Sequence, residues 1–521
     1  MKLQIPTPIS GNRILGGALL LGTLLSSSAA YGTEKGEASP LSTGALKISY
    51  EEFTLPGNEK MGMTALGISH DFTKNFHAGV GSWMAVKGER GGFITLGIDG
   101  GLSLPLTERI GVDTGLFIGG GGGRGGYTLS GGGLMLRSHA ALTYDLGSWG
   151  RLGAGVSHVD FPDGGTITST QPFVSYTLPF YSFVEKSRNN TGNRTLKSDQ
   201  YLQLSPKRHA LAVMKRDLHV ASTTLTDTGS PQGNLSLVGI EWRTYLDDNW
   251  FARLETEGAA GGNSAGYMQI LAGGGYRVPL GANLYASSDL SLGGGGGGGI
   301  DSGGGLLFNA SADMQYFLTR SLFADISAGY LKSNTGTFEA KTLAFKIGYQ
   351  TGNRSRQKTD AADNHIFVPA CMQIRAVSQT YFKAADNWRS HHADQNVDNL
   401  GVQIDYFLDR GWYLTGQGLA AYGGGAGAYM TGLVGTGARK TVAGNLFLNA
   451  EGLAGAAGGG GLAIGSGLVW QGNLGVGYDI SPALSAMMSA GRMQAMNGAF
   501  KANVIGLSLG YNFKSYMSET D

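Results

Sequence analysis

Few residues of this chain have the types and the spacing that chemistry at a protein site requires. Gly119 to Gly123 precede Arg124, as a glycine-rich loop precedes the cation of a phosphate site, but neither Gly-Lys-Ser/Thr nor a helix start follows. Gly296 to Asp301 matches the start of a calcium-binding nonapeptide, yet Gly303 stands where that motif needs an apolar residue. Neither stretch therefore predicts a ligand site.

A histidine pair is the next candidate. His391 and His392 share a polar loop with Asp394, and imidazole with carboxylate can bind a divalent metal. A solvated loop is the simpler interpretation, because the corresponding loop of the preceding repeat, TTLTDTGSPQGN, has no histidine. No Ser-His-acid signature is visible, and no Gly-x-Ser-x-Gly motif lies near a strand-to-helix turn. The sequence thus predicts no catalytic residue, no metal, no cofactor and no enzyme activity.

The feature that organises the chain is a glycine-rich hairpin that occurs three times, at 115–136, 289–308 and 447–470. Glycine weakens a strand unless it permits a bend or a close backbone approach. We expect the hairpins to provide curvature or flexible external loops, or else a constriction in a lumen or an adhesive surface loop. The candidate loop or constriction residues are Gly119, Arg124, Gly293, Gly299, Asp301, Ala457 and Gly460.

The hairpins belong to a larger repeat with a period of about 165 residues, the size of a domain. Each unit has alternating segments joined by turns, and about eight strands are expected per unit. The units are 43–184, 208–350 and 365–513, separated by polar linkers at 185–207 and 351–364 and followed by a tail at 514–521. Both linkers contain Thr-Gly-Asn-Arg.

The first 32 residues predict a cleaved signal peptide. Lys2 and Arg13 flank the N-terminal side of an apolar core at 14–25, and small residues follow at 26–32. The core is shorter than the roughly 20 residues of a membrane-spanning helix. One cysteine excludes an internal disulfide framework, and a net charge of +1 gives no support to nucleic-acid binding. An exported protein is therefore expected.

The closing segment of each unit alternates between two unlike faces. In the third, Ile505, Leu507 and Leu509 share one face, and Ser508 and Asn512 share the other. Short turns also alternate with longer loops, as in outer-membrane barrels. This pattern favours a transmembrane antiparallel β-barrel over a soluble sandwich. Aromatic residues end the closing strands, where interfacial girdles lie: Phe180, Tyr349, Tyr511 and Phe513.

The segments LGYNF, FKIGYQ, VGYDISPALSAMMSAGR and MQYFLTRSLFADISAGY resemble the strand-turn-strand and closing-strand patterns of Gram-negative outer-membrane β-barrel proteins. The resemblance covers nearly all of 43–513 and points to the porin-like class, not to one family. It implies outer-membrane lipid and the barrel-assembly machinery as partners, with Phe513 as the terminal signal. The residues after Phe513 depart from that pattern.

Two architectures fit the repeats: one barrel of about 24 strands, or three eight-stranded barrels in tandem. The linkers favour separate units, whereas the rarity of multi-barrel chains slightly favours one. The low charge content of 15% predicts a weakly charged lumen. We therefore expect a channel for small neutral solutes or an exported polymer. The alternative is a structural or adhesive protein whose barrels anchor glycine-rich surface loops.

Overall fold

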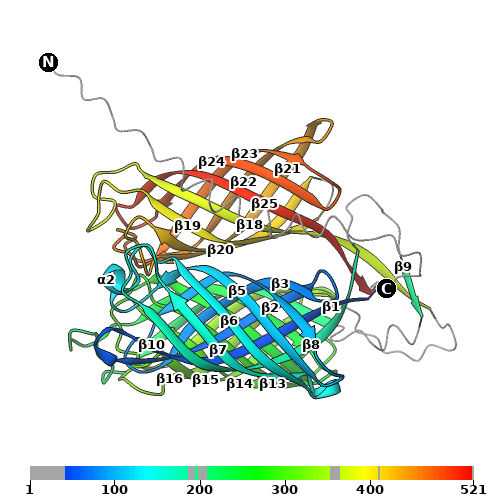
Figure 1. The fold of residues 1–521 in the computed structure, drawn as a ribbon, viewed down its shortest axis with the longest axis horizontal. Coiled ribbons are helices and arrows are strands. Elements are labelled where there is room, and N and C mark those ends of the chain that lie inside the picture. The colour runs from blue at the N-terminus through cyan, green and yellow to red at the C-terminus, as the bar shows by residue number, and fades with distance from the viewer. Residues whose placement is uncertain (1–40, 186–193, 198–207, 352–363, 409–410, 519–521) are drawn as a thin grey trace.

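The computed structural model describes residues 41–185, 194–197, 208–351, 364–408 and 411–518 (Figure 1). The predicted signal peptide lies outside these residues. The chain is all-β apart from short helical turns such as α2 (Gly126–Ser130). Its strands form three closed antiparallel barrels of eight strands each, here called barrels 1, 2 and 3 in chain order.

The strands are 10–20 residues long in the barrels, with one short extra strand, β9, between barrels 1 and 2. Barrel 1 contains β1 (Leu41–Thr54), β2 (Lys60–Asp71), β3 (Phe76–Lys87), β4 (Ile94–Pro105), β5 (Ile110–Gly122), β6 (Met135–Asp145), β7 (Arg151–Asp160) and β8 (Thr168–Glu185). Strand β9 is Arg194–Lys197. Barrel 2 contains β10 (Arg208–Val220), β11 (Leu235–Tyr245), β12 (Trp250–Gly261), β13 (Met268–Pro279), β14 (Leu284–Gly296), β15 (Leu306–Phe317), β16 (Leu322–Ser333) and β17 (Glu339–Thr351). Barrel 3 contains β18 (Asn364–Lys383), β19 (Val397–Phe407), β20 (Trp412–Gly423), β21 (Met430–Ala443), β22 (Leu446–Gly458), β23 (Leu468–Asp479), β24 (Leu484–Ala495) and β25 (Lys501–Ser518).

Closure pairs the first strand of each unit with its own last strand: β1 with β8, β10 with β17 and β18 with β25. The strand pairing is therefore that of three eight-stranded barrels, one of the two architectures that the sequence left open. Among the described residues, strand pairing that connects the sheets of barrels 1 and 3 is limited to their margin, where two residue pairs link β25 to β8 and four link β9 to β18. Strand β25 continues to Ser518 because the 20-residue β18 is long enough to pair with it. Most of the predicted tail thus extends the closing strand.

Tight turns close one end of every barrel, which we call the turn end; the glycine-rich hairpins lie at the opposite loop end. A polar side chain fixes these turns locally. In barrel 2, Asp247 Oδ1 accepts the backbone N–H groups of Asn249 (2.7 Å) and Trp250 (2.6 Å). The same role falls to Thr73, Thr107, Thr319 and Ser481 in other turns. The short-turn prediction is confirmed.

The predicted two faces of the strands are also confirmed. In β25, Ile505 is 47% exposed on the outside, whereas Asn512 is 2% exposed inside the barrel. Exposed aliphatic side chains cover the outer walls, and exposed aromatic residues gather at the turn end. The most exposed of these aromatics are Trp149, Trp250, Trp412, Tyr316, Tyr349 and Tyr478. No helix among the described residues is long and apolar enough to cross a membrane.

Candidate functional site: the junction of the barrels and their lumens

The three barrels pack in a closed ring. The fifth strand of each barrel contacts the third strand of another: β5 lies on β20, β14 on β3 and β22 on β12. Each barrel therefore offers the same two surfaces, one to each neighbour. Such head-to-tail contacts close into a ring when the rotation fits. The molecule is accordingly a pseudo-trimer within one chain.

Each crossing point contains a glycine that allows the two strands to approach closely. A Cβ added to Gly120 would lie 2.6 Å from the carbonyl oxygen of Ala420, and one added to Gly294 would lie 2.5 Å from Met84 Cγ. At the equivalent third crossing, a Cβ on Gly258 would lie 2.8 Å from the Cβ of Ala456. Every crossing thus pairs at least one glycine with the opposing residue. Small residues at such contacts let backbones approach closely, as they do between membrane helices.

Loops interlock at the loop end. The N–H of Gly91 in barrel 1 donates to the carbonyl of Gly303 in barrel 2 (2.8 Å), and the N–H of Gly427 in barrel 3 donates to the carbonyl of Gly131 in barrel 1 (2.9 Å). Arg124 adds an ion pair to Asp227 of barrel 2, with 3.4 Å between nitrogen and oxygen. These loops form one connected surface, which we call the cap.

The histidine pair belongs to this cap. The rings of His391 and His392 lie 4.7 and 5.0 Å from the ring of Tyr127 in α2 of barrel 1. Partial burial, with added repulsion from Arg389 and His392, lowers the pKa of His391 below its ordinary value. The described residues contain no group of three or more His, Cys, Asp or Glu side chains that could hold a metal ion. What the structure shows for the histidine pair is its contact with the Tyr127 ring of a neighbouring barrel.

We predict that acid loosens this contact. Because the folded-state pKa of His391 is lowered, its contribution to stability is present above the ordinary imidazole pKa of about 6.5 and is lost as the pH falls below it. Amide hydrogen exchange at 126–130, corrected for intrinsic rates, should become several-fold faster at pH 5.5 than at pH 7.5. The His391→Phe variant keeps a ring but cannot titrate. It should reduce the pH effect, and an unchanged effect would assign it to other groups.

Barrel 2 has a lumen filled with paired charges. Arg243 Nε lies 2.5 Å from Glu241, and its Nη2 lies 3.1 Å from Asp325 and 3.4 Å from Asp313. Lys346 bridges Glu241 (2.9 Å) and Asp313 (2.8 Å). A second group joins Arg216 and Arg253 to Glu255, Glu257 and Asp289. The prediction of a weakly charged lumen is wrong for barrel 2. The chain has few charged residues, but in this barrel they are concentrated at the inward-facing positions of the strands.

Barrel 1 is filled in a related way. Arg137 forms two 2.9 Å hydrogen bonds to the carboxylate of Glu51, and its guanidinium lies 4.5 Å from the Trp83 ring. Nearer the turn end, Asp113 contacts Lys47 (3.1 Å) and His139 (2.9 Å). These groups span the lumen from several strands. An eight-stranded barrel is just wide enough for side chains to fill it.

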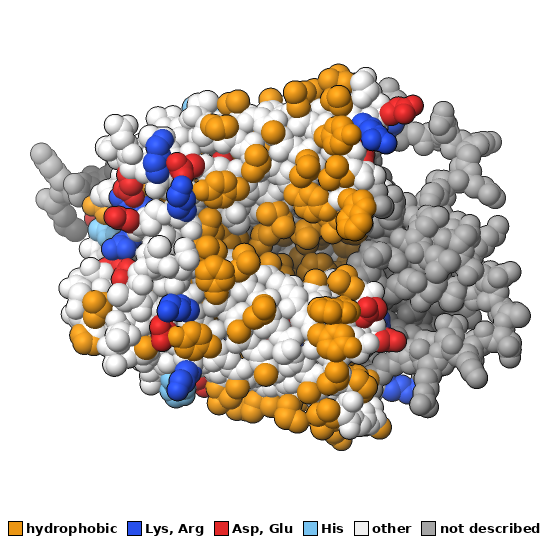
Figure 2. All heavy atoms as spheres, turned by 90° about the horizontal axis from the view of Figure 1, so that it is seen from below, with side chains coloured by type: hydrophobic (Ala, Val, Ile, Leu, Met, Phe, Trp, Pro, Cys, Tyr) orange, Lys and Arg blue, Asp and Glu red, His pale blue; other side chains and the backbone are white. Residues whose placement is uncertain are grey.

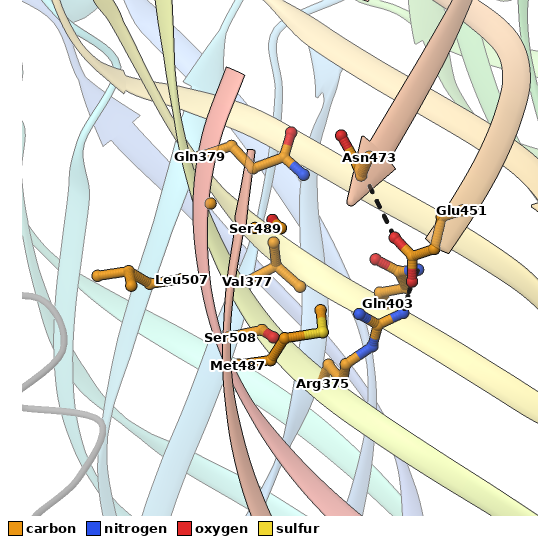
Figure 3. A pocket seen from close by; sticks show the side chains of 11 residues that line it. Arg375, Val377, Gln379, Gln403, Glu451, Asn473, Met487, Ser489, Leu507 and Ser508 are labelled. Carbon is orange, nitrogen blue, oxygen red and sulfur yellow. Dashed lines mark hydrogen bonds and ion pairs between the residues drawn. The ribbon is translucent and has the colours of Figure 1, made fainter. Parts of the chain in front are cut away.

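Barrel 3 combines one charge cluster with amides. Arg375 lies 2.8 Å from Asp405 and also pairs with Glu451, which accepts a 2.7 Å hydrogen bond from the hydroxyl of Tyr413. Figure 3 shows the adjoining space, walled by the side chains of Gln379, Gln403, Asn473, Met487 and Ser508 among others. Its volume is about 10 Å³, room for one water molecule. The lumen of barrel 3 is also filled.

Apolar clusters close the loop end of each lumen. Trp388 is fully buried in the cluster of barrel 3, stacked on Phe500 with ring centroids 6.1 Å apart. Barrel 2 has a second, aromatic cluster at its turn end, formed by Tyr245, Phe251, Phe317 and Phe323. Each barrel therefore contains stacked polar and apolar layers.

The predicted loop residues all lie at the loop end, but they do not meet at one point. Gly119 and Gly293 lie in β5 and β14, where an added Cβ would strike the neighbouring strand of the same barrel. Asp301 Oδ2 accepts the N–H and the hydroxyl of Thr337, both at 3.1 Å, and so shapes its own loop. Gly299 and Gly460 have positive φ in turns, and Ala457 is buried in the cluster of barrel 3. Arg124 alone among them forms an ion pair to another barrel.

The closing-strand aromatics lie in the half of their strands nearer the turn end, although β8 and β25 continue beyond them to Glu185 and Ser518. Tyr349 is 54% exposed, and Tyr511 packs 5.7 Å from Phe72 of barrel 1. Phe180 lies against Gly44 across the β8–β1 seam, and Phe513 pairs with Met372 across the β25–β18 seam. They therefore lie beside the closure of each barrel.

Sequence reasoning missed the lumen charges and the crossing glycines. A signal for the charges was present, because GIEWRTY and ARLETEG alternate charged with apolar residues at period two. The crossings had no such signal, since Gly120 and Gly294 resemble their glycine neighbours in sequence.

No protein-family model matches the chain, and no curated protein does. Among solved structures, a ferric enterobactin receptor, PfeA, of Pseudomonas aeruginosa matches with 11% identity over 92% of this chain and 82% of that one, at a TM-score of 0.26. The siderophore receptor PirA of Acinetobacter baumannii gives 10% identity, 90% and 80% coverage and a TM-score of 0.27. A designed transmembrane β-barrel gives 13% identity over 27% of this chain and 94% of that one, at 0.19. At these scores the matches assign no activity, and the architecture of this chain rests on its own strand pairing: it is an all-β protein of three fused eight-stranded barrels.

Proposed function

We propose that this chain is a non-conducting structural protein of the outer membrane, in which three barrels form one rigid body. The observation that carries the proposal is the filling of the described lumens by their own side chains. In barrel 2, Arg243, Arg253 and Lys346 are each no more than 3% exposed, and each binds a carboxylate of a strand that is not its neighbour in the barrel. A lumen cross-linked in this way has no continuous aqueous path.

The outer walls support membrane insertion. Side chains such as Leu474 (71% exposed) and Leu290 (70% exposed) would be costly to hydrate and are suited to lipid. Trp149, Trp250 and Trp412 lie at the turn end, where an interfacial girdle of a membrane barrel is expected. The predicted signal peptide fits export to that membrane. Outer-membrane lipid and the barrel-assembly machinery are the partners we propose.

The ends of the first and last strands of each barrel indicate how the barrels would be oriented in the membrane. Strands β1, β10 and β18 begin at the turn end, and β8, β17 and β25 end there. In bacterial barrels this end faces the periplasm. The cap would then face outward. With its loops bonded to one another, the cap is a rigid external surface and not a set of separate flexible loops.

A channel remains the competing function, because a membrane barrel of this class can transport solutes. It would require the ion-pair layers to move together, and a buried pair broken on one side leaves an unpaired charge. We therefore rank the structural function first.

Single-channel recording tests the proposal. Purified protein inserted into planar bilayers should give no current steps above the leak between −100 and +100 mV, because paired side chains block each lumen. A potential of 100 mV does work of about 2.3 kcal/mol on one elementary charge. That is less than the cost of breaking several buried ion pairs. A trimeric porin inserted in the same bilayers provides the positive control. Regular steps whose number tracks the amount of inserted protein would contradict the structural function and favour the channel.

A further inference from the structure

The lumen of barrel 1 is open at the turn end, where aromatic side chains close the other two lumens. Those aromatic residues flank the first tight turn: Tyr245 and Phe251 in barrel 2, and Phe407 and Tyr413 in barrel 3. The same turn of barrel 1 is flanked by Asp71, which is exposed, and by His77. At the second tight turn, Gly111 takes the place of Tyr285 of barrel 2. Barrel 1 thus has a carboxylate, an imidazole and a glycine where barrel 2 has three rings.

Behind this opening, one wall of barrel 1 is nearly bare. Strands β2 to β5 carry inward-facing glycines between the turn end and the middle of the barrel: Gly67, Gly79, Gly81, Gly97, Gly101 and Gly115. A Cβ added to Gly67 would meet only backbone atoms of β3, at 3.5 Å or more, so no side chain from across the lumen covers this position. Water reaches this half of the lumen, since the side chains of Lys47 and His77 are 23% and 12% exposed. We call it the vestibule.

The vestibule ends blindly inside the barrel. Arg137 of β6 reaches across the lumen to the carboxylate of Glu51 in β1 and to the ring of Trp83 in β3. All three residues are at most 5% exposed. Trp83 lies six residues along β3 from His77 at the turn end, about 20 Å of strand. The vestibule is therefore deep enough for a ligand of several carbon atoms, but it is not a channel.

Two enclosed polar atoms of the vestibule have no hydrogen-bond partner among the described residues: Oδ1 of Asp99, which lies between two of the glycines of β4, and Nδ1 of His139. The His139 side chain is 8% exposed. Lys47 and Ser103 donate to Asp113 (3.1 and 2.8 Å), so this carboxylate is an acceptor. Its 2.9 Å bond to His139 therefore needs the proton on Nε2, which leaves Nδ1 of the neutral ring as an acceptor. Both vacant atoms thus require a donor.

The charge of the vestibule also favours a cationic ligand. Three carboxylates and two cations face it: Asp71, Asp99 and Asp113 with Lys47 and Arg151. Lys47 is already bonded to Asp113, whereas the enclosed oxygen of Asp99 is an acceptor without a donor, which is costly. On the outer face that Figure 2 shows, by contrast, hydrophobic side chains cover the middle of the barrels and charged ones lie toward the ends. A cation at the depth of Asp99 would therefore bind inside the barrel.

We propose that the vestibule binds a small organic cation, with a primary ammonium group on the carboxylate of Asp99. An ammonium group has three donors and no acceptor, so it can pair with vacant acceptors. Its bond to a carboxylate is one of the stronger hydrogen bonds in proteins. The described side chains form no group of three metal ligands, which makes a metal ion the less suitable cation. The inference goes beyond the structural function, and because the vestibule is blind, binding requires no conduction.

Equilibrium dialysis of the full chain in detergent against radiolabelled putrescine tests the site. The wild type should bind about one putrescine per chain, and the uncharged analogue 1,4-butanediol should not compete. Asp99→Asn keeps the size of the side chain but removes its charge, and Gly67→Leu fills the space of the vestibule. Each should weaken binding at least tenfold. Asp217→Asn and Gly452→Leu make the same changes at exposed positions of the outer walls and should bind as the wild type does.

Each outcome decides the inference. Weakened binding in both vestibule variants with unchanged binding in both controls supports it, provided heat-modifiable mobility in gels shows that the variants are folded. If Gly67→Leu does not fold, Asp99→Asn decides alone, since it changes no volume. Binding that persists in Asp99→Asn would overturn the inference, as would displacement of putrescine by equimolar Mg²⁺. So would the absence of saturable binding up to about 10 mM, which would leave water as the partner of the vacant acceptors. Dialysis reports only binding and bilayer recording only conduction, so the two proposals fail separately.

Discussion

Replacing Arg243 by Met should destabilise barrel 2 by about 3–5 kcal/mol, the usual cost of breaking a buried ion pair from one side. The guanidinium contacts Glu241, Asp313 and Asp325, and its side chain is 2% exposed. Met fills similar volume but leaves three carboxylates around Lys346. Urea unfolding in detergent, followed by tryptophan fluorescence and by heat-modifiable mobility, measures the loss.

A charge removed from the outside of the same barrel is the control. Lys215→Met breaks the pair with Asp217 (2.8 Å), but the lysine side chain is 56% exposed, so the change should be within about 1 kcal/mol. Adding Asp325→Asn to Arg243→Met should recover part of the stability, because one orphaned carboxylate becomes neutral. Equal effects of Arg243→Met and Lys215→Met would show that the lumen pairs do not hold the barrel.

Two leucines at the crossing points should release barrel 1 from its neighbours. Gly120 lies against backbone of β20, and Gly294 lies against Met84, so each Leu would force two barrels apart. Overpacking costs about 1–3 kcal/mol at each site. Because the ring has three interfaces, one substitution leaves every barrel still attached to a neighbour. The double variant removes both interfaces of barrel 1.

Protease sites inserted between β8 and β10 and between β17 and β18 provide the readout. After cleavage, the wild type and each single variant should elute as one complex of three fragments. The double variant should release the fragment of barrel 1, which keeps its loop contacts, the short β8–β25 pairing and the contacts of β4 with β19 and β20. Gly452→Leu, on the outer wall, should behave as wild type. Co-elution of all fragments in the double variant would mean that the cap, and not the crossings, holds the ring.

The barrel strands followed from the sequence because their rules are local. Alternation in β25 assigns Ile505 outward and Asn512 inward, and Asp247 fixes its turn within three residues. Alternation and turn residues are the same in one wide barrel and in three narrow ones, since consecutive strands pair in the same way in both. They therefore do not distinguish the two architectures. Only the seams, such as Leu211 with Tyr349, distinguish the two. That pairing spans most of a repeat and has no local signature.

The contacts between the barrels could not be predicted from the sequence, for a different reason. Glycine is compatible with a bend, a loop or a close approach, and nothing in the chain assigns Gly120 to the last of these. What decides its role is the backbone of Ala420, 300 residues away. The lumen charges were within reach, because Glu241 and Arg243 occupy inward positions of one strand, but the low overall charge content concealed their concentration.

The ring of three barrels in a single chain has a consequence for biogenesis. Separate subunits would have to find one another in the membrane at a rate that falls with dilution, whereas tethered ones meet at an effective concentration set by their linkers. Ring formation is then a first-order event with fixed stoichiometry, even for a scarce protein. In a fused chain the three barrels also need not have the same sequence, and their lumens differ accordingly. Barrel 1 has a histidine–carboxylate pair (His139 with Asp113), barrel 2 has a network of ion pairs (such as Arg243 with Asp325), and barrel 3 has hydrogen-bonded amides (Gln417 with Gln403).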